Sequence, residues 1–218
     1  SIDRTTEGKG NVADYTVEEL KRFRLRRADG SLSDETIPTL EEALTACKGA
    51  VLVNIDKGVT YTRFVRKGII QVYGEGSEFE IGKGVVLHES DKDQATIITS
   101  GIMVDESLKA YEALQAEGIS VRVIDMFTWK PLDEELGVKA AKETGAIVTA
   151  ENHNVTCGLG SVVANCLSRN APTVQEFVGV QDQFGQVGPQ DFLMDEYGLR
   201  AANIVAAVAL IGLVLFAR

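Results

Sequence analysis

The feature that most constrains the fold is a series of short apolar runs in the second half of the chain. Residues 95–99, 121–125 and 146–150 are each apolar and rich in β-branched side chains. Runs of this length and composition predict buried strands. Because about twenty residues or more separate one run from the next, each connection has room for a helix.

The segments around these runs predict helices. Apolar residues recur at helical spacing from Val104 to Leu114 and again from Leu159 to Leu167. Another helix is predicted to open at Pro131, because acidic residues follow it and lysines come later, as the helix dipole favours. We therefore expect a three-layer α/β/α domain around a mainly parallel sheet.

Residues 1–58 have a different organisation. The segments 16–19 and 39–42 both have the Thr-x-x-Glu form of a helix capping box, and 50–55 predicts a buried strand. A single helix–turn–strand unit cannot bury its own apolar face. We therefore expect this segment to be an αβ fragment of a larger unit, with a domain boundary between residues 58 and 59.

Charge and cysteine content narrow the functional classes. The formal net charge is −10, of which residues 59–218 carry −8. An acidic surface repels phosphate backbones, so we expect no nucleic-acid partner. Cys47, Cys157 and Cys166 are odd in number and lack metal-ligand spacing, which favours a reducing cytoplasm. Ser1 is interpreted as a trimmed end, since no signal pattern follows it.

The first segment resembles the glycerophosphodiester phosphodiesterases over residues 2–16, 37–44 and 53–57. The resemblance implies that residues 1–58 are an αβ fragment of a TIM-type barrel, from a metal-dependent enzyme family that uses paired histidines as acid and base. Asp56 matches a metal-side acid of that family, but residues 1–58 contain no histidine. We therefore interpret Asp56 as the remnant of a metal site and expect no hydrolysis.

The second segment resembles the C-terminal domain of transketolases, and more narrowly the C-terminal subunit of bacterial split transketolases. The match spans about residues 60–205 in a single register. The stretches that carry it are 79–83, 97–101, 123–133, 151–154, 158–164, 178–186 and 197–199. The resemblance implies an assembly domain, in a family where other domains hold thiamine diphosphate and Mg²⁺.

Residues 151–161 form the candidate site. They follow a predicted strand and combine an acid, a histidine and a glycine-rich entry into a helix, whose N-terminus can bind an anion. The alternative assigns Gly158 and Gly160 to tight turns and close helix packing. The resemblance implies a substrate or interface role for His153, and we select Glu151 and His153 as substrate-binding candidates. His88 is expected to be a solvated histidine on an edge strand.

Residues 201–217 contain no charged residue and predict an apolar helix within a tail of residues 201–218. A helix that is apolar all round must be buried in a partner, in the surface left vacant by missing domains or in lipid. Seventeen residues is short for a span, which usually needs about 20. We therefore rank self-association or a partner first and a membrane last.

These observations lead to one hypothesis with two alternatives. The first is a transketolase-like C-terminal assembly domain, inactive without cofactor-bearing domains and with no catalytic or cofactor-binding residue of its own. Its partners would be those domains or a second copy. The alternatives are a phosphodiesterase remnant and a chimeric α/β protein without catalysis.

Overall fold

The structure is a computed structural model that describes residues 1–47, 61–62 and 70–216. The chain forms two compact units, residues 1–63 and 64–218. The strand predicted at 50–55 and the candidate metal ligand Asp56 lie outside the described residues.

The first unit is small and consists of short elements. They are η1 (Val12–Asp14), α1 (Val17–Leu20), β1 (Arg24–Arg26), β2 (Leu32–Thr36) and α2 (Leu40–Cys47). Both predicted capping boxes are confirmed. The Glu19 amide donates to Thr16 Oγ1 at 3.3 Å, and the Glu42 amide donates to Thr39 Oγ1 at 3.2 Å. Each threonine therefore satisfies one otherwise unpaired amide at the start of its helix.

The sheet of the first unit differs from the expected αβ fragment of a barrel. β1 and β2 pair antiparallel as a hairpin, whereas a TIM-type barrel is built from parallel strands. The turn lies at Asp29-Gly30, where Gly30 has φ +86° and the Ser31 amide donates to Asp29 Oδ1 at 2.9 Å. Asp-Gly between two extended runs is a hairpin signal. The TIM-type prediction is therefore not supported by the described residues.

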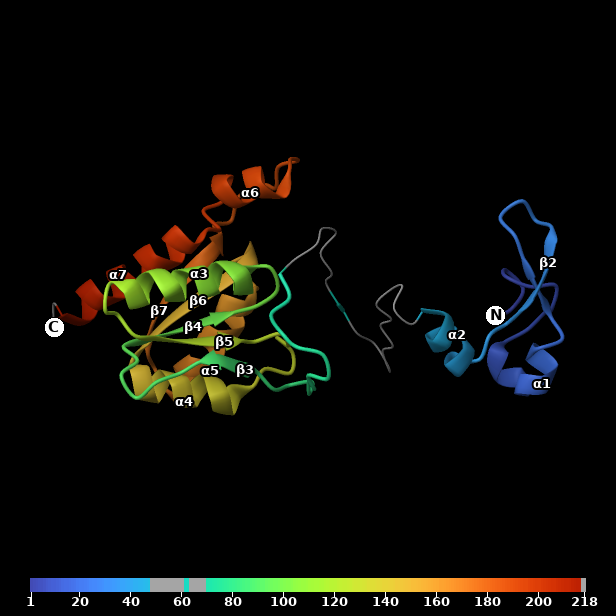
Figure 1. The fold of residues 1–218 in the computed structure, drawn as a ribbon, viewed down its shortest axis with the longest axis horizontal. Helices are drawn as coiled ribbons and strands as arrows, with labels where there is room; N and C mark the ends of the chain where they lie inside the picture. The colour runs from blue at the N-terminus through green and yellow to red at the C-terminus, as the bar shows by residue number, and fades with distance from the viewer. Residues whose placement is uncertain (48–60, 63–69, 217–218) are drawn as a thin grey trace. The chain divides into compact units, whose positions relative to one another are not determined.

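The second unit contains a five-stranded sheet flanked by helices (Figure 1). Its elements are β3 (Val85–His88), β4 (Ala95–Thr99), α3 (Met103–Ala116), β5 (Val121–Asp125), α4 (Glu134–Thr144), β6 (Ala146–Asn154), α5 (Leu159–Asn170), β7 (Val174–Val180), α6 (Gln190–Glu196) and α7 (Ala201–Phe216). The strand order is β3-β5-β4-β6-β7, and only the pairing of β3 with β5 is antiparallel. The mainly parallel α/β sheet is thus confirmed.

Two boundaries differ from the sequence-based expectation. The helix predicted to open at Pro131 begins at Glu134, because Asp133 is its N-cap and accepts the Leu136 amide at 3.1 Å. β6 continues beyond the predicted end at residue 150 to Asn154, which brings the candidate residues Glu151 and His153 into the strand.

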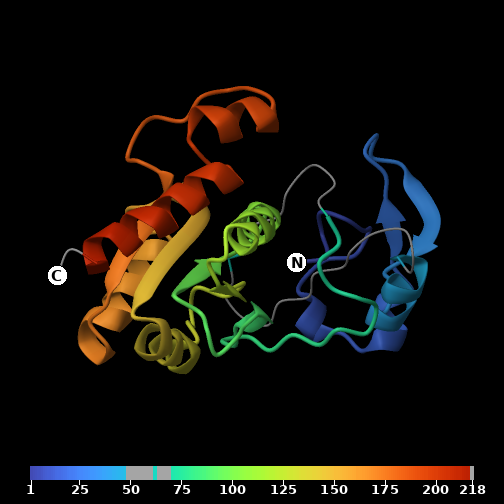
Figure 2. The same cartoon turned by 60° about the vertical axis from the view of Figure 1, so that its left-hand side comes forward.

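Alternating side chains of the strands divide the core into two layers. Ile97, Val123 and Val148 belong to a cluster that includes residues of α3 and α7. Their neighbours Ile98 and Ile124 belong to a second cluster with residues of α4 and α5. Successive strand residues point to opposite faces of a sheet, so both faces are covered. The two views show α3 and α7 on one face and α4 and α5 on the other (Figures 1 and 2).

Helix α7 buries one side only. Ile204, Val208 and Ile211 are at most 5% exposed and pack in the cluster with α3 and the sheet. Its first amide, that of Ala201, donates to the buried carboxylate of Glu106 on α3 at 2.7 Å. A negative charge at this end also suits the helix dipole.

One stretch of the described residues, Gln190–Leu213, is long and apolar enough by composition to cross a bilayer, and 22% of its best window is buried. It comprises two helices, α6 and α7, with residues 197–200 between them. The buried side of α7 belongs to the core of the unit, so extraction of the stretch into lipid would expose that core.

We expect Ile204→Ala to lower the free energy of unfolding by about 2–5 kcal/mol, because it leaves a cavity in a close-packed site. Urea denaturation of the full chain would measure the change. The matched control is Ile81→Ala, since Ile81 is 74% exposed; its effect should stay within about 0.5 kcal/mol. Equal effects of the two substitutions would contradict this packing of α7.

Candidate functional site

The candidate site lies at the carboxyl edge of the parallel strands. The chain passes from β4 to β5 on one side of β4 and later returns as β6 on the other side. The ends of β4 and β6 therefore border a topological switch point, where open α/β sheets usually bind ligands. The two ends are tied by a hydrogen bond of 3.1 Å from Thr99 Oγ1 to the Ala150 carbonyl.

Glu151, the first candidate, caps helix α5. Its side chain is 1% exposed, and its Oε2 accepts the Leu159 amide at 2.7 Å while its Oε1 accepts the Gly160 amide at 2.8 Å. Amides at a helix start otherwise lack partners, and the dipole favours a negative charge there. Both carboxylate oxygens of Glu151 thus contribute to fixing α5 against β6.

The glycines of this loop permit the close approach. A Cβ at Gly158 would lie 1.9 Å from Glu151 Oε2, and one at Gly160 would lie 2.5 Å from the Phe177 ring. Gly158 has an ordinary negative φ, so lack of space rather than backbone conformation requires glycine there. These short distances agree with the alternative interpretation, in which Gly158 and Gly160 allow close packing around the start of the helix.

This arrangement bears on the anion site predicted at the start of α5. The N-terminus of the helix already holds the Glu151 carboxylate. A diphosphate at the same amides would compete with that buried charge and be repelled by it. The start of α5 does not fit the diphosphate of a cofactor.

His153, the second candidate, is half-buried at the end of β6. Its Nδ1 lies 2.9 Å from the Asn154 carbonyl oxygen, and its ring makes an edge-to-face contact with Trp129 at a centroid distance of 5.7 Å. Trp129 Nε1 in turn donates to Ser100 Oγ, at the end of β4, at 3.1 Å. The structure therefore brings together groups from the end of β6, the loop after β5 and the end of β4, of which sequence analysis selected only His153.

The proton of neutral His153 can be placed from its partner. A carbonyl oxygen only accepts hydrogen bonds, so Nδ1 carries the proton in this contact. Nε2 of the neutral ring is then an acceptor, able to bind a hydroxyl or to take a proton. His88 differs: it is half-buried on the edge strand β3 and stacks on Tyr111 at 4.0 Å, rather than being fully solvated as expected.

Asp125 is a buried acid at the same edge that sequence analysis did not select. It ends β5, is 5% exposed, and its Oδ2 accepts the Tyr73 hydroxyl at 2.7 Å. Burial raises the pKa of Asp125, and the hydrogen bond from Tyr73 acts in the opposite direction. Burial, together with the contact to Asp125, also raises the pKa of Tyr73. The pair attaches the segment before β3 to the sheet.

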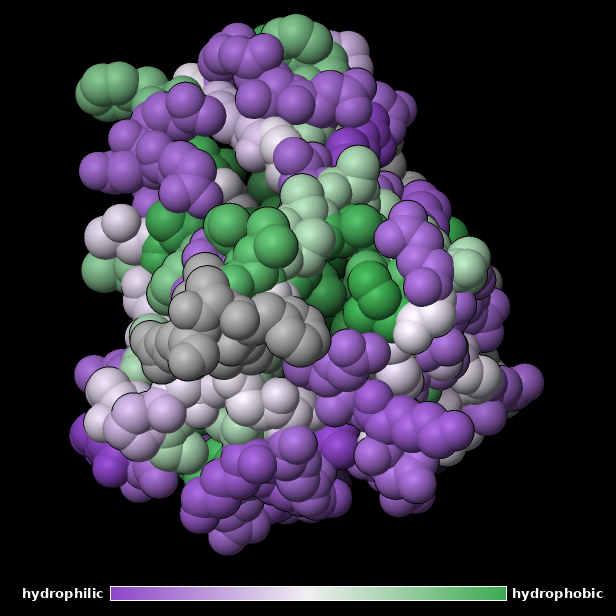
Figure 3. Space-filling view, turned by 90° about the vertical axis from the view of Figure 1, so that its left-hand side faces the viewer, coloured by the Kyte–Doolittle hydropathy of each residue, from purple (hydrophilic) through white to green (hydrophobic). Residues whose placement is uncertain are grey.

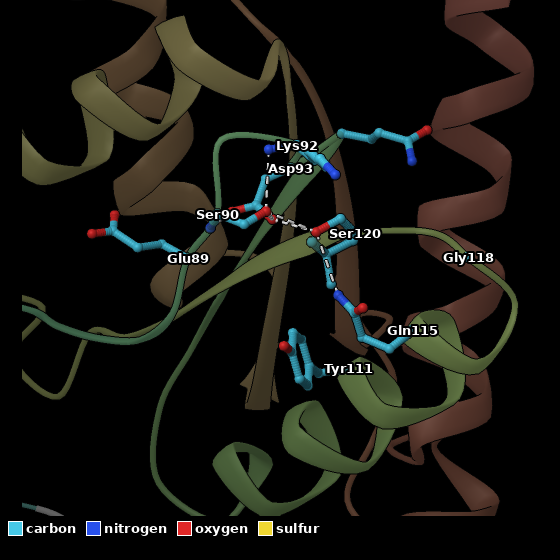
Figure 4. Close-up of a pocket in the computed structure, with 10 residues that line it drawn as sticks. Glu89, Ser90, Lys92, Asp93, Tyr111, Gln115, Gly118 and Ser120 are labelled. Carbon is cyan, nitrogen blue, oxygen red and sulfur yellow. Dashed lines mark hydrogen bonds between the residues drawn. The ribbon is translucent and has the colours of Figure 1, made fainter.

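Two hollows lie at the opposite, amino edge of the sheet. The first, of about 470 Å³, is shown in Figure 4, where Asp93 Oδ1 accepts the hydroxyls of Ser90 and Ser120 at 2.9 and 2.8 Å. The second, of about 550 Å³, includes Arg122, which pairs with Glu143 at 2.5 Å. These groups hold the loop before β4 against β5. We assign them a structural role, because strand ends rather than strand starts bind ligands in such sheets.

Metal ligation is the remaining prediction. Within residues 1–47, 61–62 and 70–216, no group of three or more His, Cys, Asp or Glu side chains is placed to hold an ion. Asp56 lies outside these residues, so its assignment as a metal remnant stays a prediction from the sequence.

Comparison with known proteins establishes the family. The model of the family "Transketolase, C-terminal domain" matches residues 82–204. The chain therefore belongs to the transketolase C-terminal domain family. The matched range contains all five strands of the sheet, and it includes Asp125, Glu151 and His153.

Individual relatives place the domain more narrowly. The chain is 44% identical over 150 residues to the 6-deoxy-6-sulfo-D-fructose transketolase subunit SqwH of Clostridium sp. (strain MSTE9), covering 69% of this chain and 46% of that protein. It is 32% identical to transketolase-like protein 2 of Mus musculus over 202 residues, 92% of this chain and 31% of that protein. The chain thus spans less than half the length of these relatives.

A solved structure gives the same result. A protein described as "Split gene transketolase, inactive beta4 tetramer" has 47% sequence identity and a TM-score of 0.61, covering 66% of this chain and 46% of that one. None of these comparisons supports the phosphodiesterase resemblance or a chimera. The alignment with the mouse protein also extends into the first unit, since it covers 92% of the chain.

We expect Glu151→Gln to lower the free energy of unfolding by about 1.5–3 kcal/mol, because it removes the charge and turns an amide donor toward a backbone N–H. The matched control is Glu112→Gln, an exposed position on α3. Thermal or urea unfolding of both variants would compare them. A Glu151→Gln variant as stable as the control would contradict the capping role.

The raised pKa of Asp125 predicts a pH effect with a definite sign. Between the unfolded pKa of about 4 and the higher native pKa, the native state retains a proton that the unfolded chain has lost. The contribution of this group to stability is therefore full below that window and declines as pH rises through it. Asp125→Asn, which keeps an acceptor for Tyr73, should gain stability relative to wild type as pH increases. Urea unfolding at several pH values, with exposed Asp91→Asn as control, would show no such gain if the assignment is wrong.

Proposed function

We propose that this chain acts as the C-terminal subunit of a split transketolase and takes part in ketol transfer together with a cofactor-binding subunit. Two findings support this: the family match over residues 82–204 and the 44% identity to a transketolase subunit.

The observation that carries the proposal is the arrangement around His153. A histidine whose Nε2 is an acceptor when the ring is neutral, an indole and a serine hydroxyl converge from the end of β6, the loop after β5 and the end of β4. Sugars present many hydroxyl donors, and aromatic faces pack on their carbons. We assign His153 a substrate-binding role at the boundary with the partner subunit, while Glu151 holds the loop in place from behind.

Thiamine diphosphate and Mg²⁺ belong to the complete transketolases. In the proposed assembly the partner subunit would bind both, because the start of α5 does not fit a diphosphate. The bound cofactor would supply the carbanion chemistry of ketol transfer. This chain would orient the sugar and exclude water from it.

The partners in this proposal are the cofactor-binding subunit and further copies of the chain. The similar solved protein is described as a β4 tetramer, which supports association between like subunits. A cytoplasmic location fits three cysteines without disulfide spacing. The phosphodiesterase alternative keeps only its sequence resemblance, since both histidines of the chain lie outside residues 1–58.

The test is reconstitution of ketol transfer. The isolated chain with thiamine diphosphate and Mg²⁺ should show no turnover of a ketose phosphate above a denatured-protein blank. Addition of a cofactor-binding subunit of a split transketolase should produce turnover. In that mixture His153→Gln should raise the KM for the donor sugar about tenfold, as expected for one lost hydrogen bond to substrate.

His88→Gln is the matched control, because His88 lies on the edge strand and stacks on Tyr111 away from the switch point. Its KM should stay unchanged. Turnover by the isolated chain would contradict the split-subunit proposal. Equal KM values for the two variants would contradict the role of His153 alone.

A further inference from the structure

Helix α7 has a second apolar side that faces outward. Seen along the helix, the residues opposite Ile204, Val208 and Ile211 are exposed. This outer stripe consists of Ala202, Asn203, Ala206, Ala209, Leu210 and Leu213. Leu210 is 48% and Leu213 is 69% exposed. Figure 3 looks onto the side where α7 ends, and hydrophobic side chains gather in the middle of it with hydrophilic ones around them.

The stripe has a size gradient along the helix. Small side chains, Ala202 and Ala206, occupy the half near the helix start, and the bulky Leu210 and Leu213 occupy the half near its end. Ala202 and Leu213 are about 16 Å apart along the axis. A surface with holes at one end and knobs at the other is complementary to its own copy when the copy runs in the opposite direction.

We propose that the outer stripe of α7 pairs with the same stripe of a second copy of this chain, antiparallel about a two-fold axis. Leu213 of each copy then packs on Ala202 of the other, and Leu210 packs beside Ala206. An isologous two-fold contact brings one patch onto itself in this way. A parallel arrangement would place leucine on leucine and leave a gap between the alanines, with the loss of their contacts.

The absence of charge on the outer stripe makes it a surface on which two copies of this acidic chain can meet. The chain has a formal charge of −10, so two copies repel each other over much of their surfaces. The segment Ala201–Phe216 contains no charged residue, and it therefore meets its copy without like charges in contact. Asn203, the polar member of the stripe, already accepts the Arg200 amide through its Oδ1 at 3.3 Å.

The expected strength of association follows from the size of the stripe. A helix of 16 residues is about 24 Å long. Its outer side offers less than the roughly 800 Å² per partner of a standard interface. We therefore expect a dimer that forms and dissociates in the micromolar range. The inference rests on the self-association named in the proposed function but is independent of ketol transfer.

Sedimentation velocity of the full chain across micromolar concentrations tests the proposal. Wild type should show a monomer–dimer equilibrium. Leu210→Lys with Leu213→Lys should weaken it about tenfold or more, since it places like charges in the contact. Ala206→Leu, which adds no charge, should also weaken it by filling the hole that receives Leu210. Ile81→Lys, at an exposed site outside α7, is the matched control and should leave the equilibrium unchanged.

Circular dichroism should show that all of these variants fold, since the changed positions are exposed or small. A wild-type chain that remains monomeric would overturn the proposal, as would a dimer unaffected by the stripe variants or equally weakened by Ile81→Lys. Co-sedimentation with phosphatidylcholine vesicles tests whether the stripe binds lipid instead. A monomer that binds vesicles through Leu210 and Leu213 would overturn the dimer proposal in favour of a lipid surface. Reconstituted ketol transfer is a separate measurement. A failure of the dimer proposal in sedimentation therefore does not decide the proposed function, which the reconstitution assay tests.

Discussion

The carboxylate of Glu151 is the interaction on which the carboxyl edge of the sheet depends. It lies in β6, three residues before the strand ends, and accepts hydrogen bonds from two amides at the start of the next helix. Charge-assisted hydrogen bonds in a low-dielectric site are stronger than those at a surface. The contact requires Gly158, where a Cβ would lie 1.9 Å from the carboxylate. One acid and one glycine thereby hold the start of α5 against β6.

The same contact decides how the candidate site can act. Because the Glu151 carboxylate occupies the N-terminus of α5, an external anion would compete with it there. Ligand binding would therefore depend on the side chains around this position. His153 on β6, Trp129 after β5 and Ser100 after β4 meet at the carboxyl edge of the sheet. The proposed role in orienting a substrate rests on these three residues. The hollows at the amino edge are lined by ion pairs and hydroxyls that hold their own loop.

Helix α7 shows how a charge-free segment can belong to a folded unit. Its inner residues complete the core formed with α3 and the sheet, and the buried Glu106 caps its start. Each large apolar side chain buried there contributes roughly 1.5–3 kcal/mol. That burial anchors the segment in the domain. The outer stripe does not contribute to this core and is available for association between molecules.

The sequence by itself determined the strands at 95–99 and 121–125 and the capping boxes at Thr16 and Thr39, because these depend on local periodicity and on neighbours three residues away. It also carried the resemblance to transketolases. Only the tertiary structure decided that Glu151 caps a helix, that Asp125 is buried beside Tyr73, and which side of α7 is covered. Those outcomes depend on residues far apart in the chain, such as Glu106 and Ala201. The local pattern predicts that α7 is an apolar helix, but only tertiary packing determines which side of it is buried.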